Sequence, residues 1–175
     1  MGLRLRLPTP SDFLKHIYFI EASGIVAGLG LVILILLAIF YTDFKDIFDH
    51  DIFHKYINVK VLVILGLLVS CIVISLFIVE LIIVLLPKCK ACTVNGNYIL
   101  AMIILEYIFI LFGFCVGISM IVFAKHYDFS SYDGQQLSAL QSLLNVGTFK
   151  VTAWAISLII FIVVTVVFAR MFQCE

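Results

Sequence analysis

The sequence predicts an all-α membrane protein, a four-helix transmembrane bundle with short amphipathic helices in the two outer loops, forming one domain over residues 1–175. Hydrophobic residues make up 64% of the 175 residues and charged residues only 13%. The mean hydropathy of +1.23 lies far above that of soluble domains. A spanning helix needs about 20 apolar residues, and four runs are long enough, at approximately 17–41, 60–86, 99–124 and 151–169.

The first span, at 17–41, carries an acid, Glu21, near its start. The run is too long for the apolar core of a signal peptide, and no small-residue cleavage pattern follows it. We therefore expect this segment to remain in the protein as a true span.

Two spans contain the GxxxG pattern, which lets helix backbones approach closely. Gly24 and Gly28 form it in the first span, and Gly113 and Gly117 form it in the third. These glycines predict helix association, either within the bundle or with a second copy or another membrane protein.

The first outer loop contains the sequence DFKDIFDHDIFHKY at 43–56. On a helix, Asp46, His50 and His54 would share one face, a spacing that can hold a metal ion. Phe, Ile and Tyr side chains repeat at the same spacing, which is typical of an amphipathic helix in the headgroup region. The amphipathic interpretation accounts for more residues, so we predict no metal or other cofactor and keep the three ligands as the alternative.

The second span, at 60–86, places Glu80 in hydrocarbon, and two cysteines follow in a CKAC sequence. Cys89 and Cys92 have the spacing of a thiol redox pair. A reducing cytosol on this side disfavours such a pair, whereas juxtamembrane cysteines suit S-palmitoylation. We expect lipidation of Cys89, Cys92 and Cys174, with a membrane thiol oxidoreductase as one alternative function.

The third span, at 99–124, contains Glu106. Counted at 1.5 Å per residue from the short loop between them, Glu80 and Glu106 both lie about 10 Å deep. An ionisable group in hydrocarbon costs at least about 2.5 kcal/mol and usually faces the bundle interior. We expect Glu21, Glu80, Glu106 and Arg170 to act in polar packing between helices, with a proton or cation relay as the alternative.

The second outer loop, at 125–150, has leucines at helical spacing: Leu137, Leu140 and Leu144. They predict a helix that faces the membrane surface or a partner. The fourth span follows at 151–169, and Arg170 closes it.

Four spans place both termini on one side, together with the short loop at 87–98. That side carries six of the eleven Lys and Arg residues, in much shorter segments than the other five. The two outer loops contain no cysteine. Both features predict cytoplasmic termini. The formal net charge of zero argues against nucleic acid as a partner.

The stretch LKHIYFIEASGIVAGLGLVILIL, from Leu14 to Leu36, resembles the opening helix of the MARVEL-type four-span family. Glu21, Gly24 and Gly28 carry the resemblance, as an acid near the cytoplasmic end followed by small residues. The rest matches in topology and length, although the outer cysteine pair of some junctional members is absent. The resemblance implies a non-enzymatic organiser of the plasma membrane or a vesicle membrane, acting in membrane apposition, vesicle trafficking, cell junctions or cell–cell fusion. Its partners would be the lipid bilayer and other membrane proteins.

The alternative function that uses the same glutamates is a small proton- or ion-coupled transporter or channel. Against it, the spans show no internal repeat and no helix broken by paired Gly and Pro. The sequence contains no enzyme signature beyond the CKAC pair, so no enzymatic activity is predicted.

Overall fold

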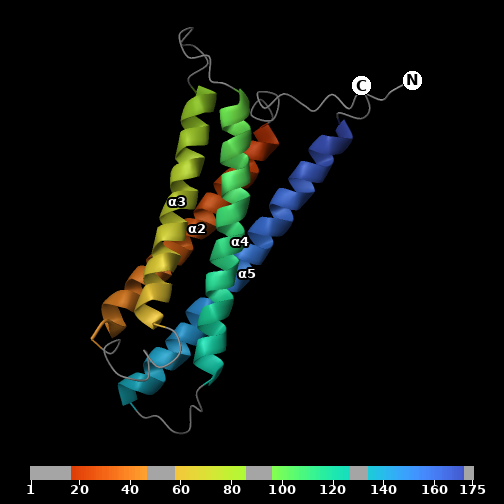
Figure 1. The fold of residues 1–175 in the computed structure, drawn as a ribbon. Helices are drawn as coiled ribbons and strands as arrows, with labels where there is room; N and C mark the ends of the chain where they lie inside the picture. The colour runs from red at the N-terminus through yellow and green to blue at the C-terminus, as the bar shows by residue number, and fades with distance from the viewer. Residues whose placement is uncertain (1–16, 47–57, 86–95, 127–133, 172–175) are drawn as a thin grey trace.

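The computed structural model describes residues 17–46, 58–85, 96–126 and 134–171 (Figure 1). These ranges contain four helices: α2 (Ile17–Phe44), α3 (Val59–Leu85), α4 (Gly96–His126) and α5 (Gly134–Met171). All four are long and apolar enough to cross a membrane. The predicted all-α four-helix class is confirmed, and the chain has the architecture of an integral multi-pass membrane protein.

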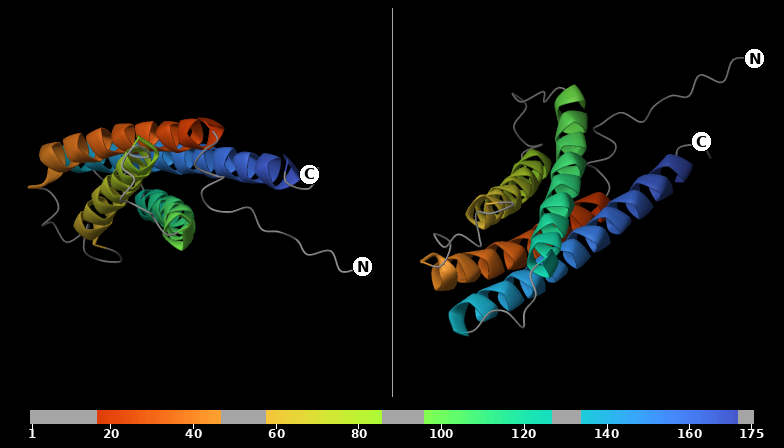
Figure 2. Two further views of the ribbon diagram at one scale, coloured as in Figure 1. Left: turned by 90° about the horizontal axis from the view of Figure 1, so that it is seen from above. Right: turned by 60° about the horizontal axis from the view of Figure 1, so that its bottom comes forward.

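The helices alternate in direction, so the start of α2, the end of α3, the start of α4 and the end of α5 lie at the same end of the bundle (Figure 1). This end is called the α2-start end below, and the opposite one the α2-finish end. Figure 2 shows α2 and α5 side by side in one layer, with α3 and α4 on one side of it. The main interfaces join α2 to α3 and α5, and α4 to α3 and α5.

Each helix buries one narrow seam of residues spaced three and four apart. In α5 the seam is Leu140, Leu143, Gly147, Lys150, Trp154, Ser157 and Phe161. This spacing keeps one face of a helix toward its neighbours along its whole length, as in coiled coils and four-helix bundles. Any side chain at a seam position is therefore enclosed, whether it is apolar or charged.

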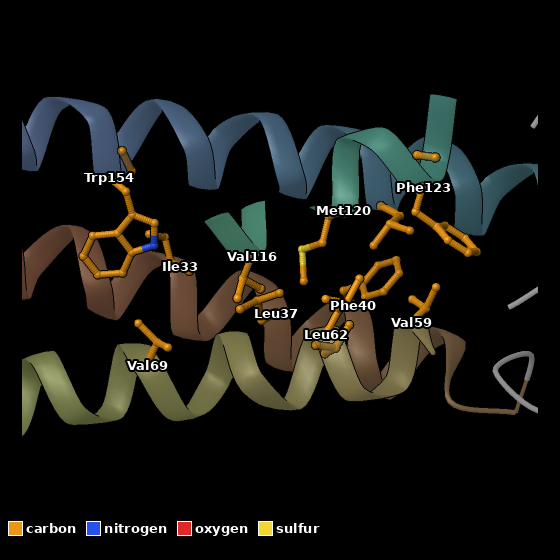
Figure 3. Packing of buried hydrophobic residues seen from close by; sticks show 14 of the residues in the cluster. Ile33, Leu37, Phe40, Val59, Leu62, Val69, Val116, Met120, Phe123 and Trp154 are labelled. Atoms are coloured by element: carbon orange, nitrogen blue, oxygen red, sulfur yellow. The ribbon is translucent and has the colours of Figure 1, made fainter. Parts of the chain in front are cut away.

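In the core, large side chains pack against glycines of the facing helix. Figure 3 shows Ile33, Leu37, Val69, Val116, Met120 and Trp154 in the interior. A Cβ atom added at Gly113 would lie 2.7 Å from Nε1 of Trp154, so the indole occupies the space that this glycine leaves free. Small residues thus set how closely α4 and α5 approach.

The outer surface of the bundle is apolar on all four helices, with large side chains such as Ile25, Leu68, Ile108 and Ile159 about half exposed. The hydroxyl groups of Ser75, Ser119, Thr148 and Thr152 donate to carbonyl oxygens of their own helices. Ser75 Oγ, for example, donates to the carbonyl oxygen of Cys71 at 2.8 Å. A surface of this kind suits contact with lipid, which offers no hydrogen-bond partners.

The start of the fourth helix differs from the sequence prediction. The leucine-rich segment expected as a separate helix in the second outer loop is the first part of α5, which runs without a break from Gly134. Leu140 and Leu143 are fully buried, so the apolar side of this segment faces the bundle rather than a membrane surface or a partner. The helix itself begins 17 residues before the expected start of the span at 151, and Lys150, which was expected in the loop, occupies a buried seam position.

Candidate functional site

Three polar side chains from three helices meet inside the bundle: Ser23 of α2, Glu80 of α3 and Glu106 of α4. Ser23 Oγ donates to Glu80 Oε2 at 2.8 Å. It also lies 3.1 Å from Oε1 and 3.3 Å from Oε2 of Glu106. Glu80 is 2% exposed, and Ser23 and Glu106 are 0% exposed. We call these three residues the polar cluster.

The seam pattern explains why these residues meet. Glu80 follows Val69 and Val73 on the buried side of α3, and Glu106 precedes Ile110 on the buried side of α4. Ser23 stands on the buried side of α2, six residues after Ile17, while Glu80 stands five residues before Leu85. At 1.5 Å per residue both lie about 8–9 Å from the α2-start end, so they share one depth.

The polar cluster has more acceptor atoms than nearby donors. Ser23 has one hydroxyl hydrogen, so it donates fully to one carboxylate at a time. Glu80 Oε1 is buried and has no hydrogen-bond partner in the described part of the chain. A proton held by either carboxyl group would supply a second donor. The arrangement can therefore hold three helices together and can also hold a proton between two acids.

Next to Glu106 in the sequence, Tyr107 of α4 contacts two residues of α5, Phe161 and Thr165. The Tyr107 ring meets the Phe161 ring edge-on, with centroids 5.1 Å apart. The Tyr107 hydroxyl lies 2.7 Å from Thr165 Oγ1. Because Thr165 donates its own hydrogen to the Phe161 carbonyl oxygen, Tyr107 is the donor in this pair. At the depth of the cluster, α4 is thus fixed to α5 as well as to α2.

A second buried ionisable residue, Lys150 of α5, lies toward the α2-finish end. Its side chain is 0% exposed, and Nζ has no hydrogen-bond partner in the described part of the chain. Nζ lies 2.5 Å from where a Cβ atom of Gly66 would stand. Fourteen residues separate Gly66 from Glu80 on α3, about 21 Å along the helix. The ammonium group is therefore too far from the polar cluster to form an ion pair with it.

The structure separates the predicted polar packing residues. Glu80 and Glu106 meet at Ser23, whereas Glu21 has an exposed side chain on the outer face of α2. Arg170 lies in the last turn of α5, and its side chain is outside the described residues. Only two of the four residues therefore come together in the described structure.

The predicted GxxxG residues also have different surroundings. A Cβ at Gly113 or Gly117 would press on α5, at 2.7 Å from Trp154 Nε1 and 2.8 Å from Val151 Cγ2. A Cβ at Gly24 would touch Phe77 of α3 at 3.4 Å, and one at Gly28 would meet nothing within 4 Å. The glycines of α4 thus serve packing within the bundle, while Gly28 faces outward.

Several predictions fall on residues that the structure does not describe. These are residues 47–56 of the amphipathic segment expected at 43–56, the lipidation sites Cys89, Cys92 and Cys174, and the ligands His50 and His54. Asp46 lies in the turn after α2 and is exposed. Among the described residues, no three His, Cys, Asp or Glu side chains are grouped to hold a metal ion.

The sequence prediction missed Ser23, Lys150 and Trp154 as interior polar residues. Ser23 could have been found from its helical spacing, because it lies three and four residues before Val26 and Ala27, which are buried on the same side of α2. Glu21, two residues earlier, is on the other side of the helix. The signal for Lys150 was the three-and-four spacing that links it to Leu143 and Trp154 across the assumed span boundary.

Comparison of this chain with protein-family models, with curated proteins and with solved structures finds no match. The buried polar residues and the apolar outer surface are therefore the features that bear on function.

Proposed function

We propose that this chain is a non-enzymatic four-span membrane organiser that acts where membranes or membrane proteins are brought together. The processes that fit are membrane apposition, vesicle trafficking, cell junctions and cell–cell fusion. The observation that carries the proposal is the convergence of both intramembrane glutamates on Ser23, with each side chain 2% exposed or less. Interior acids used in this way hold a bundle together and leave its outer faces for partners.

The outer faces supply the means of association. Gly28 lies on the exposed side of α2, between the exposed Ile25 and Val32. A glycine at this position allows the backbone of another helix to approach closely, in a second copy or in a different membrane protein. In this proposal the termini are cytoplasmic, Cys89, Cys92 and Cys174 carry lipid anchors, and the loop at 43–56 faces the opposing membrane.

The organiser function is tested with the full chain reconstituted in lipid vesicles. We expect light scattering to report vesicle clustering at protein densities at which protein-free vesicles stay dispersed. The paired substitution Glu80→Gln with Glu106→Gln should preserve clustering, because glutamine has the same shape and still accepts a hydrogen bond from Ser23. Vesicles that stay dispersed with correctly folded wild-type protein would contradict the organiser function.

A second candidate function is proton- or ion-coupled transport, and Lys150 is the observation that favours it. The structure has buried ionisable groups in both halves of the bundle, the polar cluster near the α2-start end and Lys150 near the α2-finish end. Gly66, whose Cβ position would lie 2.5 Å from Lys150 Nζ, is seven residues after Val59, about 10 Å from the start of α3. Intramembrane ionisable residues commonly mark ion or proton pathways.

The two functions give opposite results in the same vesicles. A pH-sensitive dye trapped inside reports proton flux after an external pH jump. Transport predicts flux in the wild type that the paired Glu80→Gln and Glu106→Gln substitution abolishes. The organiser function predicts the same slow leak in both proteins and in empty vesicles.

A further inference from the structure

The polar cluster joins two carboxyl groups through a single hydroxyl group. Ser23 Oγ lies 2.8 Å from Glu80 Oε2 and 3.1 Å from Glu106 Oε1. A serine hydroxyl carries one hydrogen, and its oxygen can also accept. It therefore forms both contacts as full hydrogen bonds only if it donates to one acid and accepts from the other. The accepted bond requires a carboxyl group that carries a proton.

Without such a proton the cluster has too few donors. Two ionised carboxylates present four acceptor oxygens and no donor. Ser23 offers them one hydrogen, and Glu80 Oε1 has no hydrogen-bond partner in the described part of the chain. The three side chains are 2% exposed or less, so they are removed from bulk water. A buried acceptor without a donor is costly, and more so when it is charged.

Among the described side chains, no cation stands beside the two acids. Lys150 Nζ lies at Gly66, about 21 Å from Glu80 along α3. Arg170 stands nine residues after Phe161, about 13 Å along α5, and its side chain is outside the described residues. The other described basic residues are at the α2-finish end: Lys45, Lys60, Lys125 and His126.

The other titratable side chains near the cluster do not compensate its charge. Glu21 of α2 is exposed on the outer face of that helix. Tyr107 of α4, next to Glu106, donates to Thr165 of α5. Two neighbouring negative charges in a medium of low dielectric repel strongly, and a proton on one of them removes the repulsion. The contacts and the charges therefore both favour a cluster that holds a proton.

We propose that the polar cluster is a binding site for one proton, which Glu80 and Glu106 share through Ser23. The protonated acid donates to Ser23 Oγ, and Ser23 donates to the ionised acid. The bound proton keeps α2, α3 and α4 joined, and its release leaves two like charges that push α3 and α4 apart. The proton site does not depend on the organiser function, because it is measured on the folded chain without any membrane partner.

The sign of the pH dependence follows from the number of bound protons. An unfolded chain in denaturing detergent exposes its carboxyl groups, which ionise near the ordinary glutamate value of about 4.3. Above about pH 5 the folded bundle then holds one more proton than the unfolded chain, so its stability falls as the pH rises. From about pH 5 to about pH 7 we expect the equilibrium constant for unfolding in mixed micelles to rise about tenfold per pH unit. A flat profile in the wild type would overturn the proposal.

Single glutamine variants remove the need for the proton. The amide group in Glu80→Gln or Glu106→Gln is a permanent donor in place of the protonated acid, so each variant should lose the tenfold slope. Glu21→Gln is the matched control, because Glu21 is two residues from Ser23 but exposed, and it should keep the slope. Circular dichroism confirms that each variant keeps its helices. A slope that both cluster variants retain, or that Glu21→Gln loses, would count against the site.

Infrared spectroscopy detects the proton itself. The full chain is studied near neutral pH in alkyl maltoside micelles, a detergent that has no carbonyl group of its own. We expect the wild type and Glu21→Gln to show a carboxylic-acid C=O band that moves on transfer to D2O, and both cluster variants to lack it. Absence of the band from the folded wild type would mean that both acids are ionised and would overturn the proposal. Survival of the band in either cluster variant would mean that one acid holds a proton by itself, which contradicts the shared site.

Discussion

Replacing Ser23 with alanine removes the hydroxyl group that lies between the two buried glutamates. The wild-type hydroxyl donates to Glu80 at 2.8 Å and lies 3.1 Å from Glu106, with all three side chains enclosed. Hydrogen bonds inside membrane proteins contribute about 0.6 to 2 kcal/mol, and orphaned buried polar atoms add to the loss. We expect Ser23→Ala to lower the free energy of unfolding by about 2 kcal/mol, roughly a thirtyfold change in the unfolding equilibrium.

The unfolding equilibrium is measured in mixed micelles by titration with a denaturing detergent. Ser75→Ala is the matched control, because Ser75 also sits in a span but donates to its own helix at Cys71 and faces outward. We expect Ser75→Ala to have little effect. A double-mutant cycle between Ser23→Ala and Glu80→Leu should give a coupling energy of about 0.6–2 kcal/mol. Equal effects of the two serine variants, or zero coupling in the cycle, would refute the reasoning.

Three further substitutions test the packing of α4 against α5 by the same unfolding titration. Gly113→Ala places a methyl group 2.7 Å from Trp154 Nε1 and should cost about 1–3 kcal/mol by overpacking; a stability equal to the wild type would contradict this contact. Tyr107→Phe keeps the ring but removes the hydroxyl group that lies 2.7 Å from Thr165 Oγ1, so we expect the free energy of unfolding to fall by about 1 kcal/mol. Combined with Thr165→Val, its effect should be non-additive. Phe161→Ala empties a fully buried site and should cost about 3–5 kcal/mol, whereas a loss below about 1 kcal/mol would mean that the ring is not enclosed.

The four spans were predictable because their signal is strong and local. A run of about 20 apolar residues has one stable arrangement in a bilayer, a helix with its backbone bonded internally. The depth of Glu80 and Glu106 was predictable for a similar reason, since a short loop fixes the register of the two helices that it joins. Both residues do face the interior at one depth.

The rotation of each helix about its axis was harder to predict. The spans are apolar on all sides, so hydrophobic periodicity gives little information on which side is buried. Ser23 and Glu21 are two residues apart, yet one is fully buried and the other exposed. Packing against α3 and α5, together with the hydrogen bonds of Ser23 to the glutamates of α3 and α4, decides between them. Ser23 provides the hydroxyl group that the glutamates of α3 and α4 meet. The sequence of α2 alone does not show this.

Lys150 was expected in the second outer loop, at 125–150, and the structure places it within α5. Charged residues usually end a span, because an ionisable group in hydrocarbon is costly. In α5 the seam runs through Lys150 from Leu143 to Trp154, and the side chain is enclosed. Helix periodicity was therefore the better guide to the position of Lys150.

The most direct test of the account is chemical cross-linking between α2 and α4 at the polar cluster. Cysteines replace Ser23 and Glu106 in a variant that lacks the five native cysteines, and a protease site is inserted in the loop at 87–98. Mercuric ion, which bridges two nearby thiols, should keep the two fragments together after cleavage in native membranes. In the matched control, cysteine replaces Ile25 instead of Ser23, and Ile25 is 53% exposed. The two fragments of this 25–106 variant should separate after cleavage. Separation of the 23–106 pair, or bridging of the 25–106 pair instead, would contradict the arrangement on which the account rests.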